Sequence, residues 1–215
     1  MGLPYTEARM KLYTKPGACS LADHIVLHWS GLPFEVEIVD LATMKSPDFL
    51  AFNPAGAVPV LRVGDWALTQ NAAILHYIAQ SAPDKALDGG ADLRTRAEVN
   101  RWLAFVNADV HPTFKPIFGA TRYLEDEAMI AKSQADAKTK LRGLYQRADA
   151  QLAAGNEWIA GTAAPTIADA YLYVTLRWAQ GIGVDLSGLD ALAAFRTRIE
   201  ADAGVQAALK AEGLV

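Results

Sequence analysis

Short apolar runs in the first 80 residues predict a mixture of strands and helices. Residues 11–14 form one apolar run, residues 34–39 alternate and are rich in strand formers, and residues 20–29 between them have helical spacing. Gly31 and Pro33 mark the end of this helix. The order predicts a strand–helix–strand unit with parallel strands, because the helix carries the chain back across the sheet.

A β-hairpin and a closing helix are predicted to follow. Gly64-Asp65 is a two-residue turn signal between the apolar runs 58–63 and 66–69, and helical spacing returns over 70–81. Before the hairpin, Ser46-Pro47 has the residues typical of an N-cap and the first position of a short helical turn. The order β-α-β-β-β-α predicts a mixed four-stranded sheet of the thioredoxin-like type.

Beyond the hairpin and its helix the pattern is helical throughout. Residues 83–91 are rich in proline and glycine and are predicted to link an N-terminal domain, residues 10–82, to an all-helical domain, residues 92–215. Three segments repeat apolar residues at helical spacing: Val99, Trp102, Leu103, Val106 and Val110; Leu141, Leu144, Tyr145, Ala148 and Leu152; and Ile167 to about Ala179. The third is apolar nearly all round, so we expect it at the centre of the helical domain.

Thr166 and Asp169 precede and open that central helix. They have the spacing of a capping box, with aspartate in the usual place of glutamate. Both side chains are expected to satisfy backbone N–H groups at the helix start, so we assign them a structural role.

Composition and charge narrow the classes of function. The formal net charge of −4 comes without a basic cluster, which argues against a nucleic-acid surface. No apolar run approaches the roughly 20 residues of a membrane span, and residues 1–9, which lack a signal-peptide core, are expected to form a disordered extension. A single cysteine excludes an intrachain disulfide and fits a reducing compartment, so we expect a cytoplasmic protein.

The single cysteine, Cys19, lies at the start of the predicted helix over residues 20–29. Backbone N–H groups and the helix dipole favour an anion there, so we expect the pKa of the thiol to fall below that of a free cysteine. A buried structural cysteine is the alternative, since free cysteine is among the most buried residue types.

Histidines offer two more candidate sites. His24 and His28 are four residues apart on one helix and could in principle bind a metal, but no third ligand follows at a suitable spacing, so no metal site is expected. His111 ends the first long helix, and an isolated histidine of this kind is more often a surface or packing residue than a catalytic one.

Six motifs in order resemble those of bacterial glutathione transferases, closest to the cysteine-containing beta class. They are Pro16-Gly-Ala-Cys-Ser-Leu21, Asn53-Pro-Ala-Gly56, Val58-Pro59-Val-Leu61, Thr69-Gln-Asn-Ala-Ala-Ile74, Thr166-Ile-Ala-Asp-Ala-Tyr171 and Leu176-Arg-Trp178. The resemblance runs from Met10 to the last residue and implies glutathione-transferase architecture. It also implies a homodimer, glutathione as co-substrate and an electrophilic small molecule as the second substrate.

The resemblance also implies a role for each matching residue. Cys19 would stabilise the sulfur of glutathione or exchange with it, and His111 would donate to the substrate or tune the thiolate. Val58 would pair its main chain with the cysteinyl backbone of glutathione beside a cis bond to Pro59. The other implied site residues are Gln70 and Asn71 at the γ-glutamyl carboxylate, and Phe114 and Trp178 in the hydrophobic substrate pocket.

Simpler structural roles are the alternatives at these positions. Gln70 and Asn71 could be helix caps, and Pro59 could shape a turn. The aromatic residues could belong to the core, namely Phe114, Phe118, Tyr171 and Trp178.

Departures from the beta-class pattern predict weaker binding of glutathione, or a different thiol. Gln70 stands where glutamate is common and removes a charge that would attract the α-ammonium, while Asn71 stands where a small residue is usual. Ala104 replaces an asparagine that reaches the ligand from the helical domain. The segment between Asp40 and Asn53 is short, so Lys45 is the nearest candidate for a ligand-binding lysine.

Two classes of function stay open on the sequence alone. One is an enzyme in which Cys19 and its cleft activate glutathione for attack on an apolar electrophile, or for thiol–disulfide exchange. The other is a non-catalytic binding or interaction module that uses the same fold.

Overall fold

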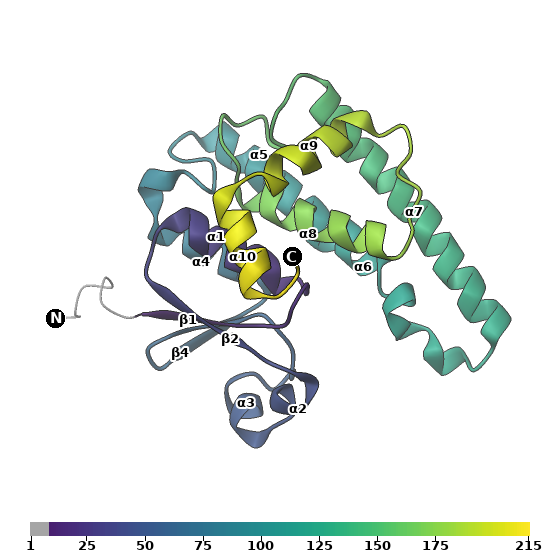
Figure 1. The fold of residues 1–215 in the computed structure, drawn as a ribbon, viewed down its shortest axis with the longest axis horizontal. Helices are drawn as coiled ribbons and strands as arrows, with labels where there is room; N and C mark the ends of the chain where they lie inside the picture. The colour runs from purple at the N-terminus through teal and green to yellow at the C-terminus, as the bar shows by residue number, and fades with distance from the viewer. Residues whose placement is uncertain (1–8) are drawn as a thin grey trace.

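The computed structural model describes residues 9–215, which form an α/β part followed by a helical part (Figure 1). The predicted disordered extension over residues 1–9 lies outside the described residues, apart from Arg9. The guanidinium of Arg9 lies 2.9 Å from the Glu35 carboxylate.

Four strands form one mixed sheet in the order β2-β1-β3-β4. They are β1 (Met10–Thr14), β2 (Phe34–Ile38), β3 (Val60–Val63) and β4 (Trp66–Thr69). β1 and β2 are parallel and are joined through α1 (Ser20–Ser30), whereas β3 runs antiparallel to both β1 and β4. The predicted mixed sheet, with its parallel unit and its hairpin, is confirmed.

Alternate side chains of β1 face two different cores. Leu12 packs in the larger core with residues of α1 and α4 (Asn71–Ser81), whereas Tyr13 belongs to a smaller core on the other face. In Figure 1, α1 and α4 lie above the sheet, and α2 (Leu41–Met44) and α3 (Pro47–Phe52) lie below it.

The two short helices below the sheet are each capped by the preceding polar side chain. Asp40 accepts from the Thr43 N–H (2.7 Å) at the start of α2, and Ser46 accepts from the Phe49 N–H (3.2 Å) at the start of α3. The helical turn predicted at Ser46-Pro47 is therefore present as α3, whereas α2 was not predicted.

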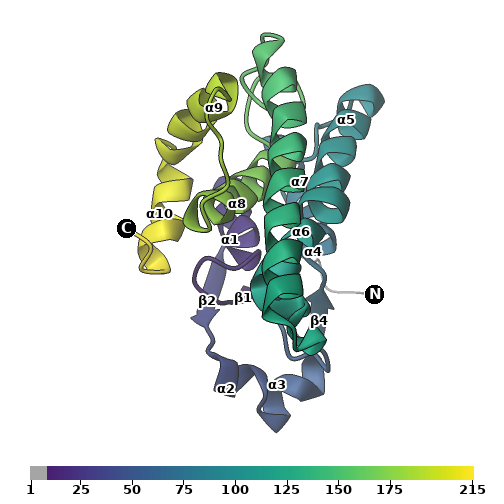
Figure 2. The same ribbon diagram turned by 90° about the vertical axis from the view of Figure 1, so that its right-hand side faces the viewer.

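The second part of the chain is helical throughout. Its elements are η1 (Pro83–Lys85), α5 (Leu93–Ala104), the π-helical η2 (Phe105–Val110), α6 (His111–Thr113), η3 (Pro116–Ala120), η4 (Arg122–Leu124), α7 (Glu127–Ala153), α8 (Ile167–Gly181), α9 (Asp190–Glu200) and α10 (Ala203–Ala211). In Figure 2, α5 lies on one side of α8, and both α9 and α10 lie on the other side. As predicted, α8 lies at the centre, with residues 167–176 all buried.

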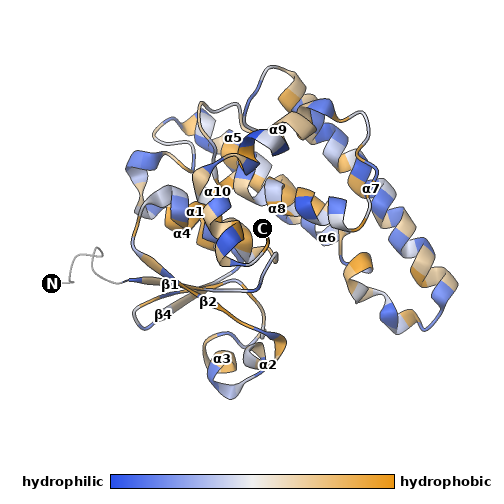
Figure 3. Ribbon diagram, viewed as in Figure 1, coloured by the Kyte–Doolittle hydropathy of each residue, from blue (hydrophilic) through white to orange (hydrophobic). Residues whose placement is uncertain are grey.

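Hydrophobic and hydrophilic residues are distributed as this arrangement requires. Figure 3 shows many hydrophobic residues along the central α8 and many hydrophilic ones along the peripheral α7. None of the helices within residues 9–215 combines the length and the apolar character needed to cross a membrane.

The last residues of the chain anchor the segment that precedes α1. Glu212, at the end of α10, is buried and accepts a hydrogen bond from the Gly17 N–H (2.9 Å). Its other carboxylate oxygen lies 3.0 Å from both the Thr14 hydroxyl and His24 Nδ1. Trp178 Nε1 of α8 donates to the Gly17 carbonyl (2.7 Å). The segment between β1 and α1 is thus fixed by the helical part.

Asp169 organises the start of α8. Its fully buried carboxylate accepts from the N–H groups of Ile159 and Thr166 and from the Thr166 hydroxyl, each at 2.8 Å. One carboxylate therefore caps the helix and also holds the preceding segment at residue 159.

We predict that Asp169→Ala lowers the free energy of unfolding by about 2–4 kcal/mol, because two buried N–H groups lose their acceptor. Urea denaturation measures the change. The control is Asp190→Ala at the exposed first residue of α9, with an expected loss below about 0.5 kcal/mol. Equal stabilities for the two variants would contradict the capping role.

Candidate functional site

A cleft of about 220 Å³ lies between the two parts of the chain. The α/β part contributes Cys19, Val58, Pro59, Gln70 and Asn71, and the helical part contributes Asn107, His111 and Tyr171. The structure therefore brings together both residues assigned to catalysis and three of the four assigned to glutathione.

The Val58–Pro59 segment forms one wall of the cleft, and its peptide bond is cis. The Val58 carbonyl oxygen lies 3.8 Å from Cys19 Sγ. The loop before it is held by the buried Asn53, whose side chain donates to the Ala57 carbonyl (2.6 Å) and accepts from the Ala55 N–H (3.2 Å). The Asn53-Pro-Ala-Gly56 motif thus sets the position of the Val58 main chain.

Cys19 is the N-cap residue of α1, so its thiol lies at a helix N-terminus as predicted. The predicted fall in its pKa is wrong. Burial is the largest cause and the nearby Asp23 carboxylate the second; together they raise the pKa of the thiol to about 12. The backbone N–H groups of Cys19 and Ser20 lower this pKa, but by less. In this structure Cys19 is a neutral thiol at neutral pH.

Asn71 connects the starts of α1 and α4 at the cleft. In the orientation that satisfies its neighbours, its buried amide nitrogen lies 2.8 Å from Asp23 Oδ2 and 3.0 Å from the Cys19 carbonyl. Its side chain is therefore occupied by protein groups, and the α4 N-terminus offers the cleft its unpaired first-turn N–H groups.

Gln70 precedes α4 with an unusual backbone conformation. Its φ of 75° lies in the left-handed region, which costs a residue other than glycine about 1–3 kcal/mol. Such conformations concentrate at ligand sites, and the Gln70 side chain lies at the cleft.

His111 reaches the cleft from the end of the π-helical segment η2. Its Nδ1 lies 2.5 Å from the hydroxyl of the fully buried Tyr171 on α8. Burial, and to a smaller extent the Lys115 cation, lower the pKa of His111 below its usual value of 6.5. The imidazole is therefore neutral at neutral pH.

Three predicted site residues lie outside this cleft. Lys45 is exposed. Its ammonium group lies close to Gly56, 3.3 Å from the position that a Cβ at Gly56 would take. Phe114 is fully buried, contrary to its assignment to the substrate pocket, and packs edge to face against Trp178 (5.3 Å between ring centroids). The exposed aromatic residue here is Phe118, which contacts both rings.

Two cleft residues were missed by the sequence reasoning. Asn107 lies four residues before His111, so a helical projection of this segment would have placed both on one face. Asn107 thus supplies a polar side chain from the helical part, which Ala104, at the position where the sequence predicts the loss of such a contact, cannot do. The sequence favours a core role for Tyr171 and gives no sign that its hydroxyl would contact His111.

The histidine pair of α1 has other partners. His24 lies 3.0 Å from the Glu212 carboxylate, and its ring stacks on His28 (5.2 Å). Within residues 9–215, no group of three or more His, Cys, Asp or Glu side chains is arranged to hold a metal ion.

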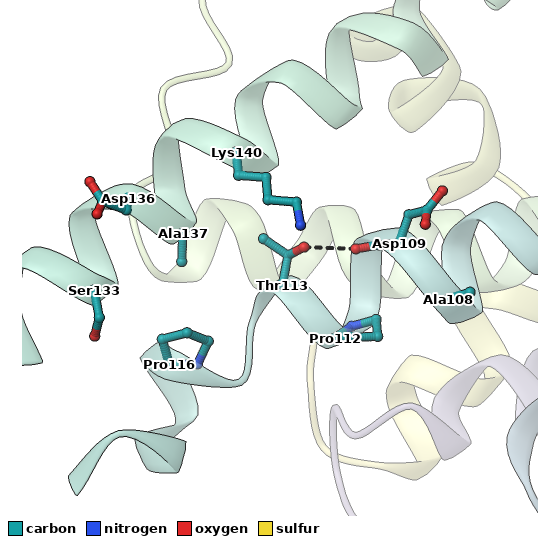
Figure 4. A pocket seen from close by; sticks show the side chains of 9 residues that line it. All are labelled: Ala108, Asp109, Pro112, Thr113, Pro116, Ser133, Asp136, Ala137 and Lys140. Atoms are coloured by element: carbon teal, nitrogen blue, oxygen red, sulfur yellow. Dashed lines mark hydrogen bonds between the residues drawn. The ribbon is translucent and has the colours of Figure 1, made fainter. Parts of the chain in front are cut away.

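A second cavity, of about 360 Å³, lies between η2 with α6 and the long α7 (Figure 4). Lys140 and Asp136 project from α7, and Thr113 donates to the Asp109 carbonyl (2.7 Å). Its lining contains none of the residues assigned to glutathione or to catalysis, so the cleft at Cys19 is the candidate active site.

Comparison with known proteins agrees with this geometry. The family "Glutathione S-transferase, N-terminal domain" matches residues 18–81, and "Glutathione S-transferase, C-terminal domain" matches residues 131–198. Glutathione S-transferase GST-4.5 of Xanthomonas campestris is 68% identical over 95% of this chain and 100% of its own length. The chain belongs to the glutathione S-transferase family.

Solved structures place it among bacterial members. The glutathione S-transferase from Xylella fastidiosa has a TM-score of 0.92 at 60% identity, covering 96% of this chain and all of that one. A sphingomonad glutathione S-transferase, solved in complex with glutathione, has a TM-score of 0.83 at 38% identity, covering 95% of this chain and all of that one. The resemblance to bacterial glutathione transferases seen in the sequence is confirmed.

We predict that iodoacetamide alkylates Cys19 at about pH 8 at least 100-fold more slowly than a free cysteine of pKa about 8.5, because only thiolates react. Cys19 is the single cysteine, so intact mass gives the rate directly. Since access to a partly buried thiol also slows the reaction, the decisive feature is the pH profile. A raised pKa requires the rate to keep rising through about pH 10 without a plateau.

Asp23→Asn removes the carboxylate that raises the thiol pKa and is expected to speed this alkylation. Asp48→Asn, at an exposed position of α3, is the matched control and should leave the rate unchanged. A plateau at neutral pH in the wild type would show that the thiol pKa is not raised.

Proposed function

We propose that this glutathione S-transferase conjugates glutathione to an apolar electrophile in the cleft at Cys19, with Cys19 and His111 at the sulfur. The observation that supports it is the meeting of a thiol, an imidazole and a helix N-terminus in one cleft. The setting we propose is the reducing cytoplasm, where glutathione is kept in its thiol form.

The cleft suits the parts of a tripeptide thiol. The Val58 main chain borders the cleft, where the cysteinyl backbone of glutathione can pair with it as an added strand. The α4 N-terminus and the Gln70 amide suit the γ-glutamyl carboxylate, because unpaired N–H groups and the helix dipole favour an anion. Asn71 contributes through its backbone, and we propose the exposed Lys45 as a cation near the opening.

Neutral donors at the sulfur would favour its thiolate. The Cys19 thiol, which holds its proton at neutral pH, can donate an S–H hydrogen bond, and the neutral His111 can donate from its ring. Donors fixed before the reaction stabilise a developing or resident anion without reorganisation. Glutathione bound there would carry more thiolate at neutral pH than it does in water, and the thiolate attacks the electrophile.

An aromatic wall next to His111 suits an apolar second substrate. Trp178 packs edge to face against His111 (4.9 Å between centroids) and against Phe118 (5.5 Å), and Phe118 is 53% exposed. We therefore assign the electrophile to Phe118 and Trp178, with Phe114 supporting them from beneath.

Thiol–disulfide exchange at Cys19 is the finer part of the proposal. The thiolate of Cys19 would attack the disulfide of oxidised glutathione, forming a mixed disulfide and releasing one glutathione thiolate. Because the pKa of Cys19 is about 12, we expect exchange to be slow at neutral pH. The alternative function, a non-catalytic binding module, requires that neither conjugation nor exchange takes place.

We predict that the wild type conjugates glutathione to chlorodinitrobenzene and that Cys19→Ala lowers kcat/KM by about 10- to 100-fold, the effect of losing one hydrogen bond to a charged group. Circular dichroism checks the fold, and calorimetry with reduced glutathione measures Kd for both proteins. Intact mass after exposure to oxidised glutathione shows whether a mixed disulfide forms. If the wild type binds glutathione but gives neither conjugation nor a mixed disulfide, the binding module is favoured.

We also propose a homodimer, and predict a light-scattering mass of twice the 23.1 kDa of one chain. Support comes from membership of the family and from Trp66, which is 47% exposed on the edge strand β4. Trp66→Lys should lower the dimer fraction at micromolar concentration, whereas Lys132→Ala on α7 should not. A wild-type monomer would contradict the proposal.

A further inference from the structure

The surroundings of the hydrogen bond between Tyr171 and His111 indicate which of the two side chains is the donor. Tyr171 is completely buried on α8, and its hydroxyl lies 2.5 Å from His111 Nδ1. Among residues 9–215, the Tyr171 hydroxyl has no other hydrogen-bond partner. A buried phenol that does not donate leaves its proton unsatisfied, which costs about 1–3 kcal/mol.

The choice between the two directions follows from what each leaves unsatisfied. If His111 donated from Nδ1, the phenolic proton of Tyr171 would be buried without an acceptor. If Tyr171 donates instead, Nδ1 is the acceptor and the neutral imidazole carries its proton on Nε2. His111 lines the open cleft, so this second N–H is not confined to the protein interior. The second arrangement gives the buried phenolic proton an acceptor.

The ring of His111 is also fixed in orientation. It packs edge to face against Tyr171 (5.9 Å, 90°) and against Trp178 (4.9 Å, 75°). Trp178 is itself held by its hydrogen bond to the Gly17 carbonyl. Burial raises the pKa of Tyr171, so the phenol keeps its proton, and burial lowers the pKa of His111, so the imidazole stays neutral.

We propose that Tyr171 is a positioning residue that holds His111 as the Nε2–H tautomer and presents this N–H to the sulfur of the bound thiol. The role at the sulfur rests on the function proposed above, whereas the tautomer is a property of the protein alone. Tyr171 acts through His111, and its own hydroxyl stays behind the imidazole.

The test is ¹⁵N NMR of the histidine side chains in the whole protein without added ligand. The chain has four histidines, and the signals of His111 are assigned by their loss in His111→Asn. We expect a protonated Nε2 and an unprotonated Nδ1 in the wild type. Tyr171→Phe, which removes only the hydroxyl, should bring His111 to a mixture of tautomers.

Tyr173→Phe is the matched control, because it removes a hydroxyl from the same helix. That hydroxyl lies 3.2 Å from Arg177 and 3.3 Å from Glu200, away from His111. The control should leave the His111 signals unchanged. In conjugation assays we expect Tyr171→Phe to lower kcat by about 3- to 10-fold with KM for glutathione nearly unchanged, as for one neutral hydrogen bond.

An Nδ1–H tautomer in the wild type would overturn the proposal, and so would an unchanged tautomer in a folded Tyr171→Phe. The wild-type spectrum decides the question even if the variant does not fold. A wild type with the expected tautomer that does not conjugate glutathione would refute the proposed function and leave the role of Tyr171 toward His111 supported.

Discussion

The two domains of this glutathione S-transferase are tied together at Gly17. Its N–H donates to the buried Glu212 after α10, and its carbonyl accepts from Trp178 on α8. Cys19 follows two residues later, so the helical domain fixes the thiol that the α/β domain supplies. His111 and Tyr171 belong to that same helical domain, and Trp178 packs directly against His111. The cleft is therefore a joint product of both domains.

The groups that face the proposed sulfur position are neutral. Cys19 keeps its proton because burial and, to a smaller extent, the nearby Asp23 disfavour its thiolate, and burial keeps His111 uncharged. Gln70 places a neutral amide at the cleft where a glutamate would place a carboxylate. Neutral donors can favour one anion, the thiolate of the ligand, without a protein cation fixed beside it. This arrangement suits conjugation better than exchange, which needs a Cys19 thiolate.

Local patterns predicted the fold well, because strand alternation, the Gly64-Asp65 turn and the capping pair at α8 act over a few residues. The motifs at Cys19, Val58 and His111 predicted which residues meet in the cleft. Effects that depend on tertiary neighbours were not predictable. The pKa of Cys19, for example, is set by burial and by Asp23. Which aromatic ring is exposed, Phe118 or Phe114, also depends on packing rather than on spacing.

A crystal structure with reduced glutathione would show directly whether the thiol lies between Cys19 and His111. We expect its sulfur within hydrogen-bond distance of Cys19 Sγ and His111 Nε2, its cysteinyl backbone paired with the Val58 main chain, and its γ-glutamyl carboxylate at the N-terminus of α4. Glutathione bound elsewhere, or with its sulfur away from both Cys19 and His111, would contradict it.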